Sequence, residues 1–153
     1  METVDLLDVA RECVERQKVN ARHSYISLTY LGESAPLCSS SRSLLDELCQ
    51  NLCDNAIRYN RPGGKVQIIT ACTRDGHCTL TVKDNGIGIP KEAQTSVFER
   101  FYRVDKSRSK ATGGTGLGLA IVKHIARIHN ARIKLDSVVD EGTTITVIFE
   151  TAS

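Results

Sequence analysis

The chain has 153 residues, enough for a single domain with its own hydrophobic core, and we expect residues 1–153 to form one. Its formal net charge of +2 is too small to indicate nucleic-acid binding. No apolar run approaches the roughly 18 residues that span a bilayer, and the amphipathic N-terminal segment does not resemble a signal peptide. We therefore expect a domain that lies in the cytoplasm and does not enter the membrane, with its cysteines as buried free thiols.

The first part of the chain is predicted to be a helix followed by a strand. Apolar residues recur at helical spacing from Leu6 to Val14, and the alternating segment YISLTYLG follows as a strand. The segment PLCSSSRS is expected to be a polar connector. Ser43 and Asp46 then have the spacing of a capping box, which predicts a second helix over about residues 44–59.

The next two β-rich runs, KVQIITACTR and HCTLTVKD, are predicted to form a hairpin. Asp75-Gly76 between them is typical of a two-residue turn. In that register Thr73 faces Cys78, so Cys72 and Cys78 point to opposite faces of the sheet and cannot form a disulfide.

The second half of the chain is predicted to contain two more helices and two more strands. A short helix is expected around residues 91–99, and a longer one follows a glycine-rich stretch and ends near His129. The strands RIKLDSVV and TTITVIFE are joined by a turn at DEGT. With three main helices and about five strands, the predicted fold class is α+β: a two-layer α/β sandwich with a mixed sheet.

A first group of polar residues lies on the second predicted helix. Asn51, Asn55 and Arg58 have spacings that place them on one face, beside the apolar stripe. Neutral amide oxygens beside an arginine suit a phosphate-bound magnesium ion. Two ordinary surface asparagines are the alternative for this face taken alone.

A second group follows the predicted hairpin, in the segment VKDNGIGIP. Asp84 at a strand end can accept a hydrogen bond from an exocyclic amine, and Gly86 and Gly88 let a ligand ring approach the backbone. This arrangement suits a purine. A calcium loop is excluded because the later acids are missing, while a plain Asn-Gly turn stays open as an alternative.

A third group is the glycine-rich stretch GGTGLGL, which precedes a helix. Glycines 113, 114, 116 and 118 expose successive N–H groups next to the positive end of the helix dipole, an arrangement suited to a polyphosphate. The stretch is neither a P-loop nor a good dinucleotide-binding fingerprint. The basic segment RFYRVDKSRSK just before it is either a solvated loop or a further contact for the same ligand.

The order and spacing of these groups resemble the catalytic ATP-binding domain of bacterial sensor histidine kinases, which has the Bergerat ATP-binding fold. NLCDNAIRY is similar to the family's N box, DNGIGIP to its first glycine box, VFERFYRVD to its F box and GGTGLGL to its second glycine box. The resemblance runs from about Val4 to Phe149. It implies ATP and Mg²⁺ as cofactors and transfer of the γ-phosphoryl group to a histidine.

The resemblance also implies roles for individual residues. Asn55 would bind the metal, Asn51, Arg58 and Arg103 would act near the phosphates, and residues 104–113 would form a flexible lid over the nucleotide. The implied nucleotide-binding residues are Asn55, Arg58, Tyr59, Asp84, Gly86, Gly88, Ile89, Tyr102, Arg103, Gly114, Thr115, Gly116, Leu117, Gly118, Leu119 and Thr143. Among them Tyr59 would stack on adenine and Thr143 would contact it through water.

The chain departs from the family pattern at two points. Asn130-Ala131 replaces the usual pair of glycines, and we expect Asn130 to take the left-handed conformation that ends a helix. A histidine in a phosphoacceptor context is missing, so we expect the dimerisation and phosphoacceptor domain of the same kinase to be the partner, with a response regulator downstream. The histidines present are expected to be structural or to lie on the surface.

Two alternatives remain at this point: an anti-sigma-type serine kinase, which shares the fold, and a nucleotide-gated binding module without chemistry. Related ATPases that hydrolyse ATP carry a carboxylate where this chain has Asn51. An amide cannot take a proton from water, so the residue types favour transfer to a protein nucleophile.

Overall fold

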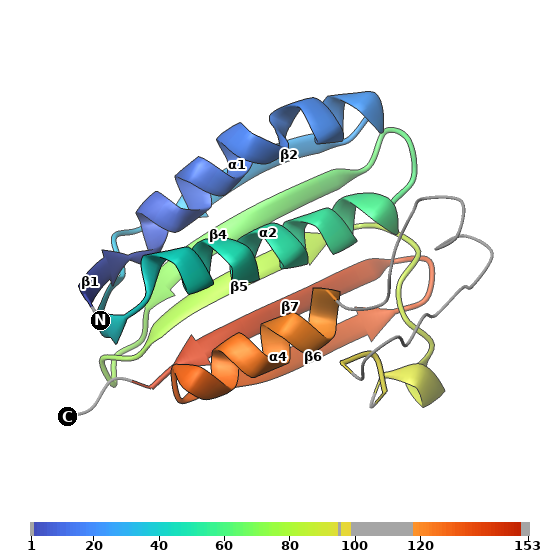
Figure 1. Ribbon diagram of the computed structural model, residues 1–153. Helices are drawn as coiled ribbons and strands as arrows, with labels where there is room; N and C mark the ends of the chain where they lie inside the picture. The colour runs from blue at the N-terminus through green and yellow to red at the C-terminus, as the bar shows by residue number, and fades with distance from the viewer. Residues whose placement is uncertain (1, 95, 99–117, 151–153) are drawn as a thin grey trace.

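Three helices cover one face of a five-stranded sheet in the computed structural model, which describes residues 2–94, 96–98 and 118–150 (Figure 1). The helices are α1 (Leu6–His23), α2 (Arg42–Arg58) and α4 (Gly118–Ile128). The strands, in their order across the sheet, are β2 (Ser27–Gly32), β4 (Lys65–Cys72), β5 (Cys78–Asp84), β7 (Gly142–Phe149) and β6 (Ala131–Val138). β2 and β4 are parallel and the other neighbours antiparallel, which confirms the predicted two-layer sandwich with a mixed sheet.

The core lies between the helices and the sheet. In α2 the apolar stripe predicted from the sequence is buried, and Leu45, Leu48 and Leu52 are each at most 1% exposed. Alternate residues of β4 and β5 face the same layer, as period-two burial requires. Each fully buried leucine stabilises the fold by about 2 kcal/mol, so this stripe fixes the side of α2 that faces the sheet.

The segment predicted to be a polar connector contains a strand. β3 (Pro36–Ser40) pairs antiparallel with β1 (Glu2–Asp5) in a small second sheet. Its serine-rich sequence hides the strand, because the partner lies more than thirty positions away along the chain. This two-stranded sheet leads directly into α1. At the start of α1, the Asp5 side chain accepts a hydrogen bond from the Leu7 amide at 3.0 Å.

Helix α2 begins slightly earlier than predicted. The residue that caps it is Ser41, whose Oγ accepts from the Leu44 amide at 3.4 Å, and not Ser43. The predicted capping box of Ser43 and Asp46 is therefore wrong, since Asp46 forms an ion pair with Arg42 instead.

The predicted register of the β4–β5 hairpin is also wrong. The connection comprises residues 73–77, not two residues, and Cys72 is paired directly with Cys78. The two side chains therefore share a face of the sheet. All six cysteines are free thiols, as predicted, but Cys38 and Cys72 are exposed, contrary to the expectation that all are buried.

Two smaller expectations have mixed outcomes. In place of a helix over residues 91–99, the described part of this segment contains a single 3-10 turn, η1 (Lys91–Ala93). Asn130 has φ of 54° just after α4, which confirms the predicted left-handed conformation. Within the described residues, no helix is both long and apolar enough to cross a membrane.

Candidate functional site

The predicted site residues that the structure describes meet at one end of the sandwich. Helix α2 and strand β5 both end there, α4 begins there, and the β6–β7 turn lies at the same end, on the right in Figure 1. The Ile87 amide donates to the carbonyl oxygen of Tyr59 at 3.1 Å, which ties the loop after β5 to the end of α2. A β-carbon on Gly86 would lie 2.4 Å from that oxygen, so only glycine permits this approach.

The start of α4 lies against the middle of α2. A β-carbon built on Gly118 would be 3.6 Å from Oδ1 of Asn51, an ordinary van der Waals distance. The first turn of a helix has N–H groups without partners inside the helix and carries the positive end of the helix dipole. The structure therefore brings the predicted phosphate-binding helix end next to the asparagine face of α2.

Asp84 is the best-defined polar group of the site. Its Oδ1 accepts hydrogen bonds from the amides of Gly86 at 2.8 Å and Thr143 at 3.3 Å. Burial raises the pKa of this carboxyl group to about 6, against the opposing effect of those two backbone bonds. Its Oδ2 has no hydrogen-bond partner among the described residues and is available to accept one from a ligand.

Ser137 joins Asp84's neighbours into a network, and sequence reasoning missed it. Its Oγ accepts from the Ile89 amide at 2.7 Å, donates to the Gly142 carbonyl at 3.0 Å and lies 2.8 Å from Oγ1 of Thr143. Ser137 pairs with Thr143 across β6 and β7. Only the pairing of these two strands identifies Ser137 as a neighbour of the site, and the sequence alone does not reveal that pairing.

Gly88, Ile89 and Leu119, three of the predicted contacts, have clear structural roles. Gly88 has φ of 74°, and a β-carbon there would lie 2.2 Å from the Val138 carbonyl oxygen. The absence of a side chain at Gly88 therefore lets the loop after β5 pack against the β6–β7 turn. Ile89 and Leu119 are both at most 9% exposed and belong to the core.

The asparagine face of α2 is half-buried. Within the described part of the chain, neither the Asn51 nor the Asn55 side-chain amide has a hydrogen-bond partner. A ligand at this face could therefore bind either amide without breaking a hydrogen bond between described residues.

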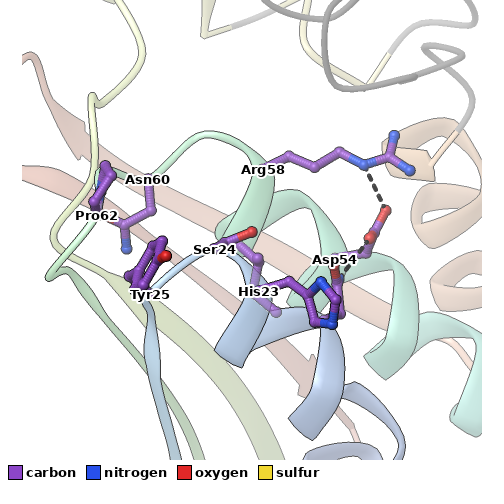
Figure 2. A pocket seen from close by; sticks show the side chains of 9 residues that line it. His23, Ser24, Tyr25, Asp54, Arg58, Asn60 and Pro62 are labelled. Carbon is purple, nitrogen blue, oxygen red and sulfur yellow. Dashed lines mark hydrogen bonds and ion pairs between the residues drawn. The ribbon is translucent and has the colours of Figure 1, made fainter.

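Arg58 is held at the edge of this face by an ion pair. Its Nε lies 3.2 Å from Oδ2 of Asp54, and Oδ1 of Asp54 accepts from Nδ2 of Asn20 at 3.4 Å. Both residues line a groove of about 500 Å³ between the ends of α1 and α2, and Figure 2 shows the ion pair among the side chains of this groove. The groove is lined by Asn20, His23, Ser24, Tyr25, Asp54, Ile57, Arg58, Asn60 and Pro62.

Some predicted residues lie outside the described part of the chain. They are Tyr102, Arg103, Gly114, Thr115, Gly116 and Leu117, together with the expected lid over residues 104–113.

Comparison with known proteins gives one family and many relatives. Residues 40–153 match the family described as histidine kinase-, DNA gyrase B- and HSP90-like ATPase. The chain is 46% identical over 147 residues to the sensor-like histidine kinase SenX3 of Mycolicibacterium smegmatis, an alignment that covers 96% of this chain and 38% of that protein. It is 37% identical over 149 residues to the sensor histidine kinase YkoH of Bacillus subtilis, covering 97% and 32%. The chain thus spans about a third of the length of these curated relatives.

Solved structures agree with this. The mycobacterial sensor histidine kinase MprB superposes with a TM-score of 0.84 at 33% identity, covering 97% of each chain. Full-length ShkA in complex with AMPPNP superposes with a TM-score of 0.81 at 23% identity, covering 99% of this chain and 31% of ShkA, and supports the fold alone.

Proposed function

Because this chain belongs to the family of histidine kinase-, DNA gyrase B- and HSP90-like ATPases, and its relatives are sensor histidine kinases, we propose that it positions Mg-ATP for phosphoryl transfer to a histidine. The observation that supports this best is Asp84. A half-buried carboxylate with one oxygen bound by two backbone amides and the other without a described partner suits the exocyclic amine of adenine. The lack of a side chain at Gly86 lets the loop after Asp84 lie against the end of α2, which fixes the backbone beside this carboxylate.

The proposed position of the triphosphate follows from the contact between α2 and α4. The phosphates would lie between the asparagine face of α2 and the first turn of α4, where unpaired N–H groups attract anions. Tyr59 would form a wall of the base pocket and Thr143 would contact adenine through water. The other proposed contacts are Arg58, Tyr102, Arg103, Gly114, Thr115, Gly116, Leu117 and Gly118, with residues 104–113 as a lid.

Asn55 is the proposed magnesium ligand. Asn55 is half-buried, its side-chain amide has no described partner, and it lies one helical turn beyond Asn51, which lies beside the start of α4. Such a neutral oxygen fits a hard cation that takes most of its ligands from phosphates and water. When bound, the ion would neutralise charge on the β- and γ-phosphates.

The residues present favour transfer over hydrolysis. Activation of a water molecule needs a base, and the side chain of Asn51 is an amide, which is not one. Among the described residues, the side chain next to Gly118 is that of Asn51 and not a carboxylate. Asn51, Arg58 and Arg103 would then orient and stabilise the γ-phosphoryl group, while the nucleophile comes from elsewhere.

The nucleophile is proposed to be a histidine of the kinase's dimerisation domain, with a response regulator as the later acceptor. His129 of this chain does not suit that role, because both of its ring nitrogens are used in the fold. Nδ1 lies 2.9 Å from the Ile125 carbonyl oxygen, and Nε2 accepts from the Ser41 amide at 3.2 Å.

Calorimetric titration of ATP into the chain, with magnesium and with EDTA, tests this proposal. We expect magnesium to strengthen binding, Asn55→Ala to abolish that enhancement, and Gln67→Ala, a polar control on β4, to retain it. GTP should bind more weakly, since its ring presents an oxygen where adenine has an amine. Equal affinity for both nucleotides, or an unchanged magnesium effect in Asn55→Ala, would refute the assigned contacts.

A further inference from the structure

Three cysteines gather at the end of the sheet opposite Asp84, and the nucleotide site uses none of them. Cys72 ends β4, Cys78 begins β5 and Cys38 lies on β3. Within the described residues, no group of three or more His, Cys, Asp or Glu side chains is arranged to hold a metal ion. Free thiols close to one another can also exchange with disulfides.

The backbone places Cys72 and Cys78 as direct cross-strand partners of the kind that leaves side chains closest. The Cys72 amide donates to Oε1 of Glu33 at 3.0 Å, so it points away from β5. In the neighbouring pair the Thr73 amide donates to the His77 carbonyl at 2.8 Å, which marks that pair as the hydrogen-bonded one. The Cα atoms of a non-hydrogen-bonded pair lie about 4.5 Å apart, inside the range of roughly 4.4–6.8 Å that a disulfide accepts.

Both thiols also point toward the same short segment. Sγ of Cys78 donates to the Pro36 carbonyl at 3.2 Å, and Sγ of Cys72 to the Ser34 carbonyl at 3.5 Å. Burial, together with the adjoining Cys72 thiol, raises the pKa of Cys78 to about 11. Cys78 is only 2% exposed whereas Cys72 is exposed, so Cys72 is the thiol that meets a reagent first.

We propose that Cys72 and Cys78 form a reversible disulfide when the protein meets a low-molecular-weight disulfide such as oxidised glutathione. The Cys72 thiolate attacks one sulfur of the reagent, the reagent's S–S bond breaks, and one glutathione leaves and takes up a proton. The Cys78 sulfur, its proton given to solvent, then attacks Sγ of Cys72 and releases the second glutathione. The two cysteines lose two protons and two electrons in total, and one glutathione disulfide is reduced to two thiols.

The disulfide would change the contacts that hold the start of α1. An oxidised pair has no S–H groups, so the carbonyls of Ser34 and Pro36 lose these donors. The same segment binds Asp5, the N-cap of α1, through the Ser34 hydroxyl and through the Ala35 amide at 2.8 Å. The modification site is thus joined to α1 by hydrogen bonds.

Thiol mapping across a series of glutathione redox ratios tests the proposal. After acid quenching, alkylation and mass spectrometry of the whole folded chain, we expect a Cys72–Cys78 disulfide that increases with the oxidised fraction and is reversed by dithiothreitol. The buried thiols Cys13, Cys49 and Cys53 should remain alkylatable only after unfolding, and they serve as an internal control for intact structure.

Single variants identify the partners. Cys72→Ser, at an exposed position, should fold normally by circular dichroism and form no internal disulfide, whereas Cys38→Ser should form it as readily as the wild type. A disulfide that includes Cys38 would overturn the proposal. A mixed glutathione disulfide that persists on Cys72 while Cys78 stays reduced would overturn it as well.

Discussion

At the scale of single residues, Asp84 combines a cost in stability with a use in binding. Its carboxyl group is half-buried and its pKa is raised to about 6, which shows that burial disfavours the charged form more than two backbone amides favour it. A group kept under such conditions in a nucleotide-binding fold is a candidate for ligand recognition. Two measurements separate its binding role from its effect on stability.

Replacing Asp84 with asparagine should weaken binding while it stabilises the free protein. Asparagine keeps an acceptor for the Gly86 and Thr143 amides but presents an NH₂ group to the adenine amine, and we expect ATP affinity to fall roughly 10- to 100-fold, about 1.5–3 kcal/mol. At pH 8 the midpoint of thermal unfolding should rise, because a buried charge is removed. Asp136→Asn on exposed β6 is the control and should change neither quantity. Unchanged ATP affinity in Asp84→Asn would remove Asp84 from the base pocket.

The raised pKa of Asp84 also predicts a pH dependence. Its folded value of about 6 exceeds the ordinary 3.8, so the folded state holds more protons between these values, and this group's contribution to stability falls as pH rises from about 4 to 6. Nucleotide binding should change in the opposite direction, since only the ionised carboxylate accepts on both oxygens.

ATP affinity measured between pH 5 and pH 8 tests this pH dependence. Asp84→Asn is the reference, because it lacks the titrating carboxyl group and its affinity changes only with protonation of the ATP phosphates. The ratio of wild-type to variant affinity should increase through pH 6. A ratio that stays constant would contradict the assignment of Asp84 to adenine.

At the scale of elements, local sequence patterns predicted the three long helices well, but they predicted the short helix over residues 91–99 and the strand registers poorly. The stripe of Leu45, Leu48 and Leu52 located α2 because each residue's burial depends on helical period alone. The register of β4 on β5 and the pairing of β1 with β3 depend on contacts between separate segments. The Asp75-Gly76 pair led to the prediction of a two-residue turn, but the connection comprises residues 73–77. This longer loop has its own hydrogen bonds, including one from the Gly76 amide to the Thr73 carbonyl at 3.0 Å.

The start of α2 offers a matched pair of substitutions. Ser41 caps the helix while Ser43, two residues later, lies inside its first turn. Ser41→Ala should lower the free energy of unfolding by about 1 kcal/mol, and Ser43→Ala by less than about 0.5 kcal/mol. Urea denaturation followed by circular dichroism compares them, and a larger loss from Ser43→Ala would restore the cap suggested by the sequence.

Two glycines near the site should respond very differently to alanine. Gly142 has φ of 126°, and a β-carbon there would lie 2.1 Å from the Asp84 carbonyl oxygen, so Gly142→Ala should cost more than about 3 kcal/mol or prevent folding. A β-carbon on Gly118 would meet, among the described residues, the Asn51 side chain at an ordinary van der Waals distance, and Gly118→Ala should change stability by less than about 0.5 kcal/mol. The same urea unfolding experiment decides this, and equal losses would show that the loop around Gly142 adjusts.

At the scale of the whole molecule, the fold places at one end groups that are far apart in the sequence. The sequence was sufficient for the fold class and for the nucleotide-binding family, because the order of its motifs is specific to that family. It was insufficient for Ser137, which joins the site through pairing of β6 with β7, and for the Asp54 carboxylate that holds Arg58. Both depend on which side chains the folded chain brings together.

We propose above that this domain transfers the γ-phosphoryl group of ATP to a histidine supplied by another domain. Incubation with γ-labelled ATP and magnesium, with and without a dimerisation fragment that carries the acceptor histidine, tests it most directly. We predict no label on this chain alone and acid-labile label on the fragment. The fragment should be labelled slowly, because a reaction in trans lacks the effective concentration that a tether provides. Acid-stable label on this chain, with none on the fragment, would refute histidine phosphorylation and indicate a serine kinase.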